Sequence, residues 1–161
     1  MAFAGNTQEA QVRLSLKDAK GKALPLNPGT IRLARAAPEV IADIPVAHPL
    51  KWDAEHPNLY TLEASLVVNG KSIETITKNV GFRKVVVDGR RLLVNGREVK
   101  LRGSGQFDCD ARDGRALPDA RAVADVKLYK QTNHNVIRPA CYPASEAFLD
   151  ACDSIGMYVG G

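Results

Sequence analysis

A run of charged residues between positions 108 and 115 contains the first side chains suited to acid–base chemistry. Asp108, Asp110 and Asp113 are interspersed with Arg112 and Arg115. Two carboxyl groups held close together can serve as a general acid and a general base. Runs of mixed charge more often form loops that face water. We therefore expect a solvated loop and keep an acid–base pair as the alternative.

Arg138 is the second candidate for chemistry, because it ends the stretch Asn135-Val136-Ile137 with its two apolar residues. This stretch is typical of a buried strand, and barrel enzymes place their reacting groups at the carboxyl ends of strands. Arg138 would there contact an anion or a hydroxyl group, or form an ion pair with Asp108 or Asp110. We expect the ion pair, since arginine so often pairs with carboxylates.

Cys109 and Cys141 each follow a predicted strand, so these two thiols could lie near each other. Together with the neighbouring aspartates they could bind a soft metal, or one of them could be a nucleophile. His134 lies seven residues before Cys141, roughly 20 Å away along an extended strand, too far to act as its base. We expect unreactive thiols, no metal and no cofactor, and keep a nucleophilic cysteine as the alternative.

Composition limits the classes of protein to consider. The chain has 161 residues, 45% of them hydrophobic and 25% charged, which is typical of a folded globular protein. Its net charge of +4 is scattered and not gathered on one basic stretch, so we expect no nucleic-acid partner. Three cysteines without paired short spacing argue against a disulfide framework. No signal peptide or membrane-length apolar run is visible, so we expect a cytoplasmic protein without a membrane partner.

The first half of the chain has the pattern of antiparallel strands. Apolar and polar residues alternate in short segments, and Asn69-Gly70 is a strong signal for a tight hairpin turn. The predicted strands cover 11–17, 30–33, 39–46, 60–68 and 72–78. Short strands at this spacing predict an immunoglobulin-like β-sandwich over residues 1–85.

The second half, residues 86–161, changes to alternating strands and helices. Hairpin turns are predicted at Asp88-Gly89 and Asn95-Gly96, and Asp119 is a plausible N-cap for a helix. The predicted elements are strands at 85–87, 92–94, 99–103, 135–138 and 157–159, and helices at 119–129 and 145–155, with Gly156 as a C-cap. This order is typical of βα units in a parallel sheet, so the predicted fold class is α+β.

Seven short motifs occur one after another over roughly residues 50–159. They are W-x-x-x-x-P-x-L-Y at 52–60, G-F-R at 81–83, L-x-N-G-[KR] at 93–97, L-R-G at 101–103, D-x-x-x-x-K at 125–130 with N-x-[IV]-R at 135–138, Y-P at 142–143, and C-D-x-x-G-[LM]-Y-V at 152–159. Each motif is weak alone, but in this order they resemble family 2 glycoside hydrolases of the β-galactosidase and β-glucuronidase kind.

The resemblance implies a β-sandwich followed by the first part of a TIM barrel, with about three strands and two helices. Family members cleave β-linked sugars with two carboxylic acids that come from later barrel strands. We therefore expect a non-catalytic scaffold or assembly module from this truncated region. Phe107 and Cys141 stand where the family has histidines, which weakens the expected contacts to sugar hydroxyls.

The candidate substrate contacts are Arg102, Asp110 and Tyr142. A second hypothesis, from another class of function, is a small hydrolase with a repurposed catalytic site around Asp108, Arg138 and Cys141 that acts on ester-like substrates. A third hypothesis is a weak carbohydrate-binding module. An incomplete barrel leaves open strand edges, so we expect self-association or a complementing barrel chain. The pair Trp52 and Tyr60 is expected in the core, with a sugar platform as the alternative.

Overall fold

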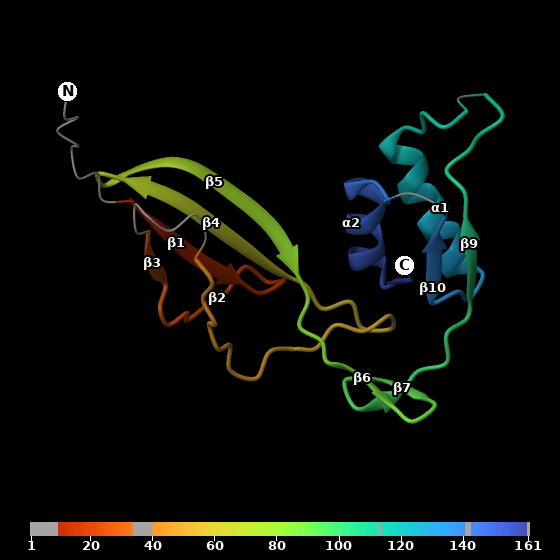
Figure 1. Ribbon diagram of the computed structural model, residues 1–161, viewed down its shortest axis with the longest axis horizontal. Coiled ribbons are helices and arrows are strands. Elements are labelled where there is room, and N and C mark those ends of the chain that lie inside the picture. The colour runs from red at the N-terminus through yellow and green to blue at the C-terminus, as the bar shows by residue number, and fades with distance from the viewer. Residues whose placement is uncertain (1–9, 34–39, 113, 141–142, 161) are drawn as a thin grey trace, which may run out of the picture. The chain divides into compact units, whose positions relative to one another are not determined.

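A computed structural model describes residues 10–33, 40–112, 114–140 and 143–160 (Figure 1). The chain divides into two compact units. Unit 1 comprises Met1–Pro49 and Tyr60–Val80, and unit 2 comprises Leu50–Leu59 and Gly81–Gly161. The segment Leu50–Leu59 therefore belongs to unit 2, although the residues on both sides of it belong to unit 1.

Unit 1 contains one five-stranded antiparallel sheet. Its strands are β1 (Ala10–Lys17), β2 (Ala23–Leu24), β3 (Thr30–Leu33), β4 (Tyr60–Val68) and β5 (Lys71–Val80), in the order β2-β1-β4-β5 with β3 also paired to β1. The hairpin predicted at Asn69-Gly70 is confirmed, because both residues have the positive φ that such a turn requires. Among the described residues of unit 1, no second sheet faces this one.

The strand predicted at 39–46 is wrong for its described part. Residues 40–46 form no strand, and the Ile41 side chain is 84% exposed. Alternation of apolar and polar residues predicts a strand only where a neighbouring strand accepts its hydrogen bonds, and among the described residues no strand pairs with 40–46. Glu39 lies outside the described residues.

Unit 2 contains a small antiparallel sheet with the two predicted hairpins. The turn at Asn95-Gly96 is confirmed, but the first turn is Gly89-Arg90 and not Asp88-Gly89, because Asp88 still pairs with Arg91. Its strands are β6 (Val85–Asp88), β7 (Arg91–Val94) and β8 (Arg97–Glu98), in the order β6-β7-β8. Asn95 and Gly96 have φ values of 54° and 81°, as expected for a two-residue turn with two left-handed positions.

The remainder of unit 2 confirms the predicted βα units. Strand β9 (Gly103–Gln106), helix α1 (Asp119–Gln131), strand β10 (Val136–Pro139), helix α2 (Glu146–Ile155) and strand β11 (Tyr158–Val159) alternate, and the strands form a parallel sheet in the order β11-β10-β9. The core between sheet and helices contains Val126, Ile137, Phe148, Ala151, Cys152 and Met157. Ser145 caps α2 by accepting a hydrogen bond from Phe148 N, and Gly156 closes it with a left-handed φ of 85°.

Details of three predicted elements are wrong. The strand predicted at 99–103 begins only at Gly103, because pairing with β10 begins there. Asp119 is the first helical residue and Pro118 is the N-cap, since proline suits a helix boundary and an acid in the first turn favours the helix dipole. The helix predicted at 145–155 begins at Glu146, with Ser145 as its N-cap. Leu128 and Leu149 on the two helices are exposed, because no described element covers them.

The segment Leu50–Leu59 is anchored on α1 and α2 within unit 2. The Trp52 side chain is 2% exposed, and its indole N–H donates to the Asp153 carbonyl near the end of α2 at 2.8 Å. Lys130 Nζ donates to the carbonyl oxygens of Ala54 at 2.6 Å and Gly156 at 3.0 Å. The bonds to Asp153 and Gly156 satisfy carbonyl groups that the end of α2 leaves without intrahelical partners, and the bond to Ala54 ties the segment to α1.

Candidate functional site

The carboxyl ends of β9 and β10 are bordered by Gln106, Asp108 and Arg138, which lie on two different faces of the sheet. Ser104 lies opposite Ile137 in the register, and Gln106 lies opposite Pro139. Ile137 is fully buried in the core against the helices. Because side chains alternate along a strand, Gln106 shares this helix-facing side and Arg138 projects from the opposite side.

Asp108 therefore does not meet Arg138. Its Oδ1 accepts a hydrogen bond from Gln106 Nε2 at 3.3 Å, on the helix-facing side of the sheet. The ion pair expected between Arg138 and Asp108 or Asp110 is not formed, and the exposed Arg138 side chain makes no ion pair within the described part of the chain. Separation on opposite faces of one sheet is the physical reason.

Asp110 forms an ion pair with helix α1. Its Oδ2 lies 3.2 Å from Arg121 Nη1, and Arg121 Nε donates to Asp125 Oδ1 at 2.9 Å. The hydrogen bond that Arg121 donates to Asp125, together with the negative charges of Asp125 and Asp110, raises the pKa of Arg121. Asp110 Oδ1 also accepts from the backbone N–H of Arg112 at 2.8 Å. This carboxylate orders the loop before α1 and is not paired with Asp108; Asp113 lies outside the described residues.

Gln106 was not predicted from the sequence, although it is the most unusual polar residue at this end of the sheet. It is buried, and its Oε1 atom has no hydrogen-bond partner among the described residues. The contact of its Nε2 with Asp108 fixes which way the amide points. A glutamine in a run of exposed glycine and serine carries no signal of burial.

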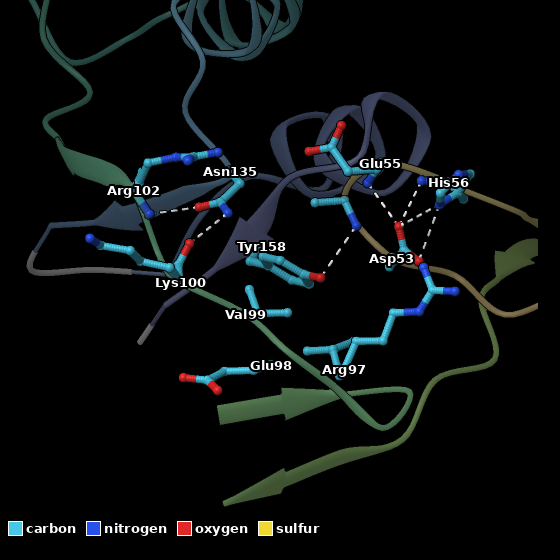
Figure 2. A pocket seen from close by; sticks show the side chains of 12 residues that line it. Asp53, Glu55, His56, Arg97, Glu98, Val99, Lys100, Arg102, Asn135 and Tyr158 are labelled. Atoms are coloured by element: carbon cyan, nitrogen blue, oxygen red, sulfur yellow. Dashed lines mark hydrogen bonds and ion pairs between the residues drawn. The ribbon is translucent and has the colours of Figure 1, made fainter. Parts of the chain in front are cut away.

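Arg102 lies at the opposite end of β9, about 13 Å from Gln106 along the strand. It borders an open pocket of about 250 Å³ at the amino-terminal ends of the parallel strands (Figure 2). The pocket is lined by Asp53, Ala54, Glu55, His56, Val94, Arg97, Glu98, Val99, Lys100, Arg102, Asn135 and Tyr158. The structure does not bring Arg102 together with Asp110, which lies beyond the far end of the strand.

Asn135 organises this pocket from a buried position. Figure 2 shows its amide between the backbones of Arg102 and Lys100. Its Oδ1 accepts from Arg102 N at 2.7 Å, and its Nδ2 donates to the Lys100 carbonyl at 3.0 Å. In the sequence, only the position of this polar residue directly before an apolar strand pointed to a structural role for Asn135. Its two hydrogen-bond partners, Arg102 and Lys100, are 33 and 35 residues away in sequence, so they could not be predicted.

Two ionisable groups of the pocket have shifted pKa values. Partial burial would raise the pKa of Asp53, but backbone N–H groups of His56 and Glu55 and the His56 ring donate to its carboxylate and lower it. Burial raises the pKa of Tyr158, whose hydroxyl oxygen accepts from Ala54 N at 3.4 Å. In barrels the amino-terminal end of the strands generally serves stability, and these bonds fix the segment 53–56 in place.

The described thiols are both free, and they differ in reactivity. Cys109 is exposed, whereas burial raises the pKa of Cys152 to about 12 and leaves it protonated at neutral pH. No group of three or more metal-ligating side chains occurs among the residues that the structure describes. Cys141 and Tyr142 lie outside the described residues, so the predicted roles of this pair stay predictions.

The remaining aromatic and histidine candidates have structural surroundings. Trp52 and Tyr60 are buried, which confirms their expected place in the core. His134 Nδ1 lies 2.9 Å from Thr132 Oγ1, and its ring packs edge-on against Tyr129. His134 therefore closes the turn after α1.

Comparison with known protein families decides the identity of these two units. The family description "Glycosyl hydrolases family 2" matches residues 4–83, and "Glycosyl hydrolases family 2, TIM barrel domain" matches residues 85–160. The chain belongs to glycoside hydrolase family 2. The resemblance stated from the sequence motifs is thereby confirmed, as is the order of sandwich domain and barrel start.

Relatives of this family 2 chain are much longer than the chain. It is 37% identical to a β-galactosidase of Pseudoalteromonas haloplanktis over 74% of its length and 32% identical to one of Priestia megaterium over 98%. It spans only 12% and 16% of those two proteins. Among solved structures, a Bacteroides uniformis β-glucuronidase is similar with a TM-score of 0.81 and 26% identity, over 94% of this chain and 19% of that one.

Membrane insertion through a helix has no support in the structure. No helix formed by the described residues has the length and apolar character needed to span a bilayer.

Proposed function

We propose that this family 2 chain is a non-catalytic scaffold or assembly module that supplies the start of a glycosidase barrel. The observation that carries the proposal is the open three-stranded parallel sheet β11-β10-β9. A barrel of this type closes with eight strands, so β9 and β11 each present an edge that further strands can pair with. A complementing barrel chain is the partner that fits these edges best.

Exposed apolar side chains support the same proposal. Phe107, Leu128, Leu149 and Val159 of unit 2 are large hydrophobic residues exposed to solvent. Clusters of exposed apolar surface commonly mark interaction sites. Additional barrel strands and helices would bury such residues at the sheet edges and on the helices.

The arrangement of acids supports a non-catalytic role for the chain by itself. Retaining glycosidases hold two carboxyl groups about 5–5.5 Å apart across the scissile bond. Asp108 is bonded to Gln106 and Asp110 to Arg121, each on the helix-facing side or in the loop before α1. Arg138, on the opposite face, is the residue that we expect to border the reacting centre once a barrel is completed.

Finer features belong to the same proposal. We place the border between an immunoglobulin-like sandwich and a partial barrel near residue 85, and the protein in the cytoplasm, where its free thiols would stay reduced. In the completed protein, the substrate would be a β-linked sugar of the kind that the names of its β-galactosidase and β-glucuronidase relatives indicate. Contact with carbohydrate is proposed only for that completed barrel.

Reconstitution tests the proposal. The purified chain is assayed with p-nitrophenyl β-galactoside, β-glucuronide and acetate, alone and mixed with the remaining barrel of the Priestia megaterium relative made as a separate polypeptide. We expect no rate above buffer from the chain alone, and a complex with the added barrel. In that complex Arg138→Ala should lower any glycosidase rate, whereas Arg90→Ala, an exposed turn residue, should not.

The repurposed hydrolase is the competing function. Hydrolysis by the isolated chain that is lost in Arg138→Ala or Cys141→Ala would establish it and refute the scaffold. Failure of the chain to bind the added barrel, with both polypeptides folded by circular dichroism, would also count against the scaffold.

A further inference from the structure

Strand β6 is an unusual edge strand. It is the outer strand of the sheet β6-β7-β8, and within the described part of the chain it pairs with β7 alone (Figure 1). Its three consecutive valines, Val85, Val86 and Val87, are 52%, 38% and 72% exposed. Exposed apolar edges readily pair with another strand, and proteins usually protect them with charges. The edge strand β5 is protected in this way by Lys71, Glu74 and Lys78.

The backbone of β6 shows which groups the open edge presents. Lys84 N donates to Asn95 Oδ1 at 3.0 Å, and the Lys84 carbonyl accepts from Asn95 N at 2.8 Å, so both groups point toward β7. Backbone N–H and C=O groups alternate sides along an antiparallel strand. The N–H and C=O groups of Val85 and Val87 therefore point to the open edge.

We propose that β6 pairs with β6 of a second copy of this chain around a two-fold axis at Val86. In this antiparallel register Val85 lies opposite Val87 of the partner subunit, and the reverse pair follows by symmetry. Both residues present their backbone groups to the open edge, so the two pairs form four main-chain hydrogen bonds. A two-fold contact of this kind uses the same surface on both copies and closes as a dimer.

Charge complementarity selects this register. Lys84 lies opposite Asp88 of the partner subunit, and the two-fold axis repeats this pairing on the other side. The exposed Asp88 carboxylate also pairs with Arg91 of its own chain, so Lys84 would be its second cation. Lys84, Val86 and Asp88 share one face of the strand, because side chains alternate. The charged pair occupies a non-hydrogen-bonded position, where opposing residues are closer. A shift by two residues separates the charges and loses half of the main-chain bonds.

The contact is small, so the association is expected to be weak and reversible. A strand of four residues buries far less surface than the about 1,200–2,000 Å² of a stable interface. The proposal deepens the assembly role by naming a second copy as a partner. It uses β6, and not the parallel edges β9 and β11, so the two can fail separately.

A charge-swap experiment tests the pairing. Sedimentation equilibrium over a wide concentration range is run on the full chain, on Lys84→Glu, on Asp88→Lys and on an equal mixture of the two variants. Each variant alone opposes like charges and should associate about tenfold more weakly, while the mixture should regain the affinity of the wild-type chain. Lys71→Glu on β5, the same change on another edge strand, should have no effect.

A proline substitution gives a second measurement. Val85→Pro removes an N–H group from the open edge without removing a bond to β7, so it should abolish dimers and leave the circular dichroism spectrum intact. A chain that stays monomeric at every concentration overturns the proposal. Self-association that is unchanged in the charge variants and in Val85→Pro also overturns the proposal, because it must then use another surface. Reconstitution with the added barrel remains the separate test of the scaffold.

Discussion

Replacing Lys130 by methionine is expected to destabilise unit 2 by about 2–4 kcal/mol. The ammonium group of Lys130 donates to two carbonyl oxygens, Ala54 O at 2.6 Å and Gly156 O at 3.0 Å. Ala54 and Gly156 are both buried, so water cannot readily replace the lost donor. Methionine keeps most of the aliphatic stem, and the substitution therefore isolates the two charge-assisted bonds.

The magnitude follows from the cost of leaving buried acceptors without partners. A hydrogen bond to a charged group contributes about 1.5–3 kcal/mol, and an unsatisfied buried carbonyl costs about 1–3 kcal/mol. Two such carbonyls would cost about 2–6 kcal/mol. Because Lys130 is partly exposed, we expect the lower half of this range, about 2–4 kcal/mol. Even so, the loss is a large fraction of the about 5–15 kcal/mol that stabilises a typical domain.

Urea unfolding followed by circular dichroism measures this change. Lys127→Met is the matched control, because Lys127 lies on the same helix and is exposed. The control should change the free energy of unfolding by less than about 0.5 kcal/mol. A loss in Lys130→Met that is no larger than in the control would refute the capping role and show that the segment 50–59 is held by other contacts.

Three further predictions concern the same unit. Trp52→Phe keeps a buried ring but removes the N–H that donates to the end of α2, and should lower the free energy of unfolding by about 1–1.5 kcal/mol in the same urea assay. Iodoacetamide should label Cys109 in the native protein but Cys152 only after unfolding, as mass spectrometry of the peptides can show, because burial raises the pKa of Cys152 to about 12. The lowered pKa of Asp53 means that its ionised form stabilises the fold above the unfolded pKa, and this contribution is lost as the pH falls through the folded value. The stability advantage of the wild type over Asp53→Asn should therefore be constant at neutral pH and shrink below about pH 4, and an advantage that persists in acid would contradict the assigned hydrogen bonds.

Local chemistry made several elements predictable. Asn69-Gly70 and Asn95-Gly96 form tight hairpin turns, because each pair tolerates the positive φ angles that such turns require. Gly156 ends helix α2 as expected, because a glycine can adopt a left-handed conformation, and the predicted start was off by one residue. The order of motifs was sufficient for the family, since it depends only on residue types along the chain.

Contacts between distant residues decided the rest. Asp108 and Arg138 are both near strand ends, but the register of β9 with β10 places them on opposite faces of the sheet. The alternation in 39–46 predicted a strand, but no neighbouring strand pairs with the described part of this segment.

The amino-acid sequence by itself determined the family, the two Asn-Gly turns, the end of helix α2 and the alternation of strands and helices, because these depend on residues close together in the chain. Only the tertiary structure decided that the segment Leu50–Leu59 belongs to unit 2, where Lys130 and Asp153 hold it. Those bonds join residues 76 and 101 positions apart, and no local pattern records such a pairing.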